Sequence, residues 1–156
     1  VGLAALKYGD SSNQASKDYI FDVDRFTSFE GNTGPYILYT IVRIKSILKN
    51  YEKVTGSVIE NGTIRPYDIE SQINLMLEAS KFNETIANAY EELAPHKICK
   101  YVYDLSDAFN TFYHENKIIA EEDKEKQESW IALIKLVLDI LETSINILGF
   151  KAPERM

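Results

Sequence analysis

The chain has 156 residues, of which 45% are hydrophobic and 26% are charged, and its formal net charge is −7. This size and balance are typical of one globular domain with a buried core, and no apolar run reaches the roughly 18 residues that a membrane-spanning helix needs. We therefore expect a cytoplasmic protein without a membrane segment, and the acidic balance argues against nucleic-acid binding through bulk charge alone.

Helical periodicity runs through most of the chain, with turn residues between the segments. Asn32 and Thr33 supply a helix cap, and Pro35 stands near the first helical position, where its missing N–H is not needed. Asp68 is expected to cap a later helix, and Gly149 to close the last one. In chain order we expect a helix end over 2–8, a brief strand or extended strap over 18–23, a helix over 35–53, a loop over 56–65, and helices over 69–77, 82–93, 98–112 and 130–148. Such helices and short loops predict an all-α antiparallel bundle.

The predicted helix over 35–53 carries two distinct faces. At about 100° per residue, one side collects the apolar residues Ile37, Ile41, Ile44, Leu48 and Tyr51. Tyr36, Tyr39 and Arg43 cluster roughly a third of a turn away. Aromatic rings beside a cation suit single-stranded nucleic acid, because bases stack on rings and a guanidinium meets a phosphate or a base edge. Tyrosines at this spacing are also typical of half-buried packing residues, so spacing alone leaves both interpretations open.

Charge is distributed unevenly along the sequence. Lys45, Lys49 and Lys53 recur at helical spacing, Lys97 stands near the start of a later helix, and acidic residues concentrate over 121–128. This separation permits a basic face on an acidic body, where specific base contacts contribute more to affinity than bulk attraction does. A solvated helix face is the other interpretation of the lysine row.

The sequence contains no convincing catalytic or metal-binding pattern. His96 and His114 stand at opposite ends of one predicted helix, without the Cys or carboxylate spacing of a metal site. A phosphate loop, a nucleophile elbow and a spaced carboxylate pair are also missing. The single cysteine, Cys99, excludes an internal disulfide. We therefore expect no catalytic residue, no metal and no cofactor in this chain.

Ordered blocks along the chain resemble the C-terminal region of arginyl-tRNA synthetases, class I enzymes with an anticodon-binding domain of the DALR type. The blocks are VGLAALKYGDSSNQASKDYIFDVDRFTSFEG at the start, NTGPY at 32–36, LAPHKICKYVYDLSDAFNTFYHENKI at 93–118 and LGFKAPERM at 148–156. The first block resembles the exit of the family's catalytic domain. The resemblance therefore implies the end of that domain or a connecting segment over 1–30, and a helical anticodon-binding domain over 31–156.

The resemblance also implies functional residues, at matching positions only. In the family, aromatic residues of the helices and the extreme C-terminus contact splayed-out anticodon bases. The matching positions are Tyr36, Tyr39, Arg43, Asn110, Tyr113, Arg155 and Met156, and the candidates for phosphate contacts are Lys45, Lys49 and Lys97. Phe109 and Phe112 lie close to an apolar stripe and are expected in the core. Family members tend to carry basic residues on the last helix, whereas this chain has Trp130 in an apolar run there, which argues against phosphate contacts from that helix.

The implied function divides between this chain and an upstream domain. The class I active-site signatures are missing here, and the chain begins with Val1, so we expect a piece of a longer protein whose catalytic domain activates arginine with ATP and Mg²⁺. The expected partners are an arginine-accepting tRNA and that catalytic domain, without oligomerisation. The alternative is a non-catalytic helical interaction module, in which the face with Tyr36 and Tyr39 meets a protein partner through aromatic anchors.

Overall fold

The computed structural model describes residues 1–14, 17 and 19–156. Every regular element within these residues is a helix, which confirms the predicted fold class. In chain order the helices are α1 (Gly2–Ser11), α2 (Val23–Thr27), α3 (Gly34–Thr55), α4 (Glu70–Ser80), α5 (Phe82–Glu91), α6 (Pro95–Glu115) and α7 (Lys124–Ile147). Over the ranges that the structure describes, none of them is both long enough and apolar enough to cross a membrane.

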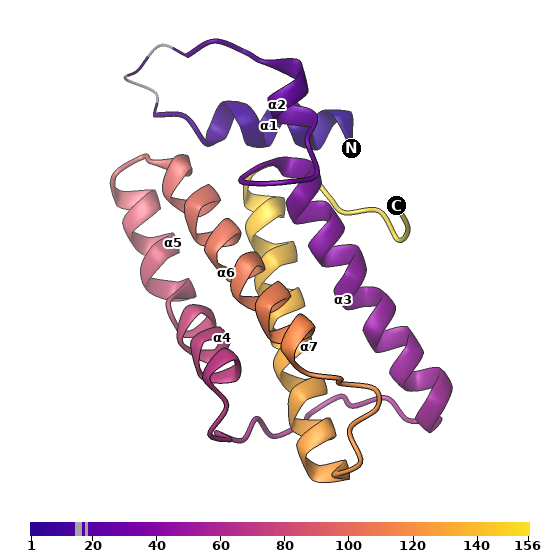
Figure 1. The fold of residues 1–156 in the computed structure, drawn as a ribbon. Helices are drawn as coiled ribbons and strands as arrows, with labels where there is room; N and C mark the ends of the chain where they lie inside the picture. The colour runs from indigo at the N-terminus through magenta and orange to yellow at the C-terminus, as the bar shows by residue number, and fades with distance from the viewer. Residues whose placement is uncertain (15–16, 18) are drawn as a thin grey trace.

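The long helices form an antiparallel bundle (Figure 1). α3 runs away from the end that α1 covers, α4 and α5 return toward it, α6 runs away again and α7 returns. α6 packs against α4, α5, α3 and α7, so it is the central helix of the bundle. The C-terminal segment leaves α7 at the end covered by α1 and turns out beside α3 (Figure 1).

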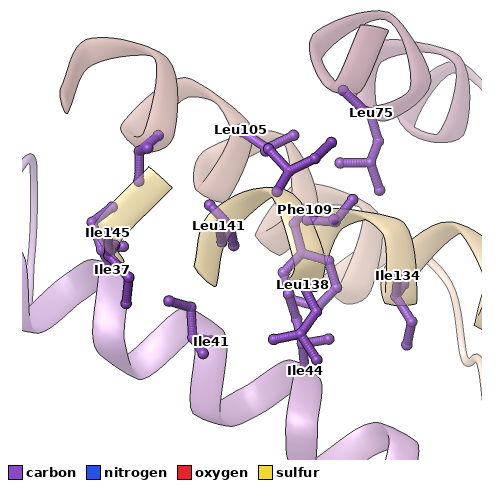
Figure 2. Packing of buried hydrophobic residues seen from close by; sticks show 14 of the residues in the cluster. Ile37, Ile41, Ile44, Leu75, Leu105, Phe109, Ile134, Leu138, Leu141 and Ile145 are labelled. Carbon is purple, nitrogen blue, oxygen red and sulfur yellow. The ribbon is translucent and has the colours of Figure 1, made fainter. Parts of the chain in front are cut away.

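Apolar stripes of α3, α6 and α7 meet in one core, which α4 completes (Figure 2). The labelled side chains of this core are Ile37, Ile41, Ile44, Leu75, Leu105, Phe109, Ile134, Leu138, Leu141 and Ile145. All of them are buried, and each contributes about 1.5–3 kcal/mol through removal from water. The apolar face predicted for the first long helix is therefore the face that packs into the bundle, and Phe109 and Phe112 lie in the core as expected.

Local capping fixes where α3 begins and ends. The Thr33 hydroxyl oxygen accepts a hydrogen bond from the N–H of Tyr36 at 3.3 Å, and Pro35 lies in the first turn. At the other end Gly56 adopts φ +67°, a left-handed conformation that glycine takes without steric cost. The predicted cap and the predicted start of this helix are therefore confirmed, and the helix continues two residues past 53.

The prediction of a brief strand over 18–23 is wrong, whereas the alternative of an extended strap agrees with the extended backbone of Asp22. Asp18 lies outside the described residues, residues 19–22 form no regular element, and the short helix α2 begins at Val23. The Asp22 carboxylate caps α2 by accepting a hydrogen bond from the N–H of Arg25 at 3.1 Å. Alternation of residue types over 18–23 favours a strand, but Asp is also a favoured helix cap.

Two predicted features of the middle helices are also wrong. Asp68 does not cap α4, because Ile69 occupies the cap position and no side chain bonds there. The next helix ends at Glu91 instead of continuing to Leu93, whose backbone adopts φ +51° and whose side chain is 84% exposed. The left-handed residue reverses the chain, so that Pro95 can begin α6 with its own fixed φ.

α1 is joined closely to the bundle. Tyr8 is fully buried, and its hydroxyl lies 2.7 Å from the backbone carbonyl oxygen of Cys99 in α6. Burial raises the pKa of the Cys99 thiol to about 12, so this cysteine stays protonated and behaves as a small apolar residue. Ala4 and Tyr8 of α1 pack in the core of the bundle. The predicted domain boundary near residue 30 stays a prediction.

We expect Gly34→Ala to destabilise the fold where α1 crosses α3. A Cβ at Gly34 would overlap the backbone carbonyl of Ala4, and overpacking against backbone costs about 1–3 kcal/mol, more than the helix propensity that alanine adds. Gly2→Ala is the matched control, because a Cβ there meets nothing within 4 Å. Urea denaturation should show a loss of stability for Gly34→Ala alone; equal midpoints for the two variants would contradict the close approach of the two helices.

Candidate nucleic-acid interface

Polar and aromatic side chains of α3 and α6 meet around Arg43. Its Nη1 donates to Asn110 Oδ1 at 2.7 Å, and its Nη2 donates to the Tyr39 hydroxyl oxygen at 2.7 Å. Asn110 Nδ2 in turn donates to the hydroxyl of Tyr36 at 3.0 Å and to that of Thr40 at 3.1 Å. We call the group formed by Tyr36, Tyr39, Arg43, Asn110 and Tyr113 the Arg43 cluster.

Asn110 holds the cluster together. Asn110 is only 8% exposed, so both ends of its side-chain amide bond to protein groups in place of water. The guanidinium of Arg43 can only donate, which requires Oδ1 of the amide to face it and Nδ2 to face the hydroxyls of Tyr36 and Thr40. This arrangement fixes the amide orientation and holds Arg43 in one position.

The outer part of the Arg43 cluster is aromatic and open to water. The Arg43 Cζ lies 4.7 Å from the ring centroid of Tyr39 and 5.0 Å from that of Tyr113, within the range of a cation–π contact. Tyr39 is 42% exposed and Tyr113 is 36% exposed. Tyr113 also stacks on the buried ring of Phe109, with the centroids 6.1 Å apart at 22°. Two partly exposed rings are therefore held beside one guanidinium, and one of them, Tyr113, rests on the core residue Phe109.

The charge of Arg43 is not neutralised by a neighbour. No carboxylate among the described residues lies within 4.0 Å of its guanidinium, whose hydrogen-bond partners are the neutral Asn110 and Tyr39. Burial raises the pKa of the Tyr36 hydroxyl, and the hydrogen bond from Asn110 partly opposes that rise. The tyrosine is neutral at physiological pH in consequence, and the positive charge remains available to an incoming anion or base edge.

The lysines predicted to contact phosphate all have carboxylate partners. Lys45 and Lys49 reach the two carboxylate oxygens of Glu154 at 3.4 Å and 3.3 Å, and Lys97 pairs with Glu92. The side chain of Lys45 is only 13% exposed. Their predicted contacts with phosphate remain predictions, and each would require a lysine to exchange its carboxylate for a phosphate.

The C-terminal segment is docked on the bundle up to its last residues. Phe150 is buried and meets the ring of Tyr8 edge-on at 6.4 Å, and Lys7 Nζ donates to the Gly149 carbonyl oxygen at 2.7 Å. Arg155 and Met156 follow and are exposed. Glu154 ties this end to α3, the helix of Tyr39 and Arg43, but no hydrogen bond, ion pair or cation–π contact within the described residues joins Arg155 or Met156 to the Arg43 cluster.

Glu154 should make the docking of the C-terminal segment sensitive to acid. The hydrogen bond from Lys49 and the charge of Lys45 lower the pKa of this carboxyl below its ordinary value. The stabilisation that the Glu154 carboxylate gives to the docked segment is therefore complete above the ordinary pKa of a glutamate. It is lost as the pH falls through the lowered pKa. The Phe150 amide donates to the Ile145 carbonyl oxygen, and its protection against hydrogen exchange should be lower after acidification than near neutral pH.

Glu154→Gln should lower the protection of this segment against hydrogen exchange already near neutral pH. Glu52→Gln, the same charge change at an exposed position of α3, the helix that carries Lys45 and Lys49, is the control and should leave the segment docked. Identical exchange in the Glu154→Gln variant and the unsubstituted chain would mean that the apolar contacts of Phe150 hold the segment without the carboxylate.

The chain is similar to a defined group of known proteins. The family model described as the DALR anticodon binding domain matches residues 37–156. The chain is 62% identical over 157 residues to the arginine–tRNA ligase of Agathobacter rectalis and 54% identical over 156 residues to that of Alkaliphilus oremlandii, and each match covers 100% of this chain and 26% of the relative.

Solved structures show the same likeness. The arginyl-tRNA synthetase of Thermus thermophilus superposes with a TM-score of 0.87 at 25% identity, over 99% of this chain and 26% of that one. The arginyl-tRNA synthetase of Plasmodium falciparum gives a TM-score of 0.83 at 29% identity, over 99% of this chain and 27% of that one. The chain thus spans about a quarter of the length of the proteins that it matches.

Proposed function

The chain belongs to the DALR anticodon binding domain family, and from that premise we propose that it recognises the anticodon of an arginine-accepting tRNA. The observation that carries this proposal is the Arg43 cluster, where two partly exposed rings flank a guanidinium with no carboxylate partner among the described residues. Single-stranded RNA loops are recognised by side chains of these kinds, because their unpaired bases offer π-faces and polar edges.

The roles within the cluster follow from exposure and chemistry. Tyr39 and Tyr113 stack on unpaired bases, each base contributing about 1–3 kcal/mol. Arg43 donates to a base edge or a phosphate, and its hydrogen bonds to neutral groups leave its charge free for this. Tyr36 and Asn110 hold Arg43 in position more than they face RNA.

The remaining predicted contacts have weaker support. Arg155 and Met156 are exposed at the end of a docked segment, so they complete the proposed surface only if RNA binding brings them toward the Arg43 cluster. Lys49 and Lys97 contact phosphate after giving up Glu154 and Glu92, and Lys45 contributes least because it is the most enclosed of the three.

We also propose that the chemical reaction of the complete protein takes place outside this chain. The relatives are arginine–tRNA ligases about four times as long, so the complete protein is proposed to join arginine to its tRNA in the cytoplasm. The part that activates arginine with ATP and Mg²⁺ is then the rest of the ligase, which is also the proposed protein partner of this chain.

Titration with an arginine tRNA transcript and with transcripts substituted in the anticodon tests the proposal. We expect the native anticodon to bind at least about 10-fold more tightly, which corresponds to one recognised base at about 1–3 kcal/mol. Affinity should also fall with added salt. Equal affinity for all anticodons would overturn the proposal, and affinity that ignores salt would favour a protein-interaction module instead.

A further inference from the structure

A groove of about 660 Å³ opens beside the Arg43 cluster, along α3 and the segment that follows α6. Arg43 and Tyr113 line the part that adjoins the cluster, and Asn50, His114 and Lys117 line the rest. The volume falls within the range of roughly 300–1,000 Å³ that is usual for sites of small ligands. The groove therefore extends the surface of the two exposed rings into a hollow that can hold a further group.

The groove is distinguished by its charge. Arg43, Lys117 and His114 line it, and no Asp or Glu does, although the chain has 24 acidic residues. Each of the four other described hollows, of about 250 to 520 Å³, is lined by at least one carboxylate. In a protein with a net charge of −7, this hollow is thus the one among the five that suits an anionic ligand.

Two polar side chains that line the groove are also unengaged. The side chains of Asn50 and Lys117 are exposed, and neither has a hydrogen bond or an ion pair with any residue that the structure describes. Lys45, Lys49 and Lys97 differ in this respect, since each already faces a carboxylate. A phosphate could approach Lys117 without displacing a protein anion, which makes it the stronger candidate for a phosphate contact.

The floor of the groove supplies an apolar surface. Ile47 is 8% exposed and Ile119 is partly buried against the core, and both line the hollow. An apolar floor with a cation and an amide at its edge matches a nucleotide, whose base is flat and apolar on its faces while its phosphate is charged.

We propose that this groove binds the nucleotide adjoining the one that stacks on Tyr113, with Lys117 contacting its phosphate and Asn50 hydrogen-bonding its base or ribose. The assignment rests on the proposed function, because the neighbouring nucleotide belongs to the same anticodon loop. It adds two contacting residues that neither helical periodicity nor family resemblance had indicated.

Lys117→Met and Asn50→Ala test the assignment in titrations of the arginine tRNA transcript at several salt concentrations. Lys117→Met should weaken binding about 5- to 10-fold and reduce the slope of log affinity against log salt by about 0.7, the value for one contact with a single-stranded phosphate. Asn50→Ala should weaken binding about 3- to 10-fold without changing the slope, because a neutral hydrogen bond is lost. Thermal unfolding monitored by circular dichroism should be unchanged, since both side chains are exposed.

Lys100→Met is the matched control, with the same charge change near the other end of α6, where Lys100 pairs with Asp104 at 2.7 Å. It should alter affinity less than about twofold. The groove assignment is overturned, and the proposed function stands, if the unsubstituted chain discriminates between anticodons while Lys117→Met binds with unchanged affinity and slope. If the unsubstituted chain does not discriminate, the proposed function fails and the groove assignment fails with it.

Discussion

Trp130→Ala is expected to lower the free energy of unfolding by about 3–5 kcal/mol, the cost of removing a large buried aromatic side chain. Trp130 is 2% exposed and meets the ring of Phe112 edge-on at 5.6 Å. Its Nε1 donates to the buried Oε1 of Gln72 at 2.8 Å, and Gln72 Nε2 donates to the Arg65 carbonyl oxygen at 2.6 Å. The substitution therefore opens a cavity and also leaves a buried acceptor unsatisfied.

Trp130→Phe separates these two effects in guanidinium denaturation. Phenylalanine keeps much of the buried ring and loses only the donor, so we expect a smaller loss of about 1–3 kcal/mol. A loss below about 1.5 kcal/mol for Trp130→Ala would contradict the burial of this α7 side chain against α4 and α6. The same placement accounts for an apolar last helix where a phosphate-binding helix would carry basic residues.

Arg43→Met is expected to weaken binding of the arginine tRNA transcript by about 30- to 100-fold, a loss of about 2–2.7 kcal/mol that is usual for a charged hydrogen-bonding residue at the centre of an interface. The variant loses the charge and also the hydrogen bonds that order Tyr39 and Asn110. Methionine keeps an unbranched apolar chain, so the packing of the stem is largely retained.

Arg65→Met provides the control for Arg43→Met in the same titration. Arg65 is also a partly exposed arginine, but it pairs with Glu125 at 2.8 Å and lies outside the Arg43 cluster. Its replacement should change affinity less than about twofold, because an exposed ion pair contributes little. Equal losses for the two variants would show that RNA responds to overall charge and not to the geometry around Arg43.

Local features of the fold were predictable from sequence, and distant pairings were not. Thr33, Pro35 and the apolar spacing of Ile37 and Ile41 define the start and the inner face of α3, since each acts within a few residues of itself. The end of α5 was missed because Leu93 has a left-handed backbone, which no residue preference for leucine indicates.

In the candidate site, too, neighbours along one helix were predictable from sequence and contacts between distant residues were not. The proximity of Tyr36, Tyr39 and Arg43 follows from helical spacing alone, whereas Asn110 was placed beside them only through family resemblance. The ion pairs of Glu154 join residues more than 100 positions apart, and nothing in local sequence indicates them. Lys117 follows the end of α6, so its place in a groove with Arg43 depends on how two helices pack.

The ratio of affinities for native and anticodon-substituted tRNA, measured for the unsubstituted chain and for Arg43→Met, tests the central claim most directly. Stacking on Tyr39 and Tyr113 tolerates any base, so discrimination comes from polar contacts, chiefly those of Arg43, with the proposed contact of Asn50 as a second source. We expect the ratio of at least about 10 to fall toward about 1 in the variant. A ratio that stays the same while overall affinity drops would contradict recognition of the anticodon by this cluster.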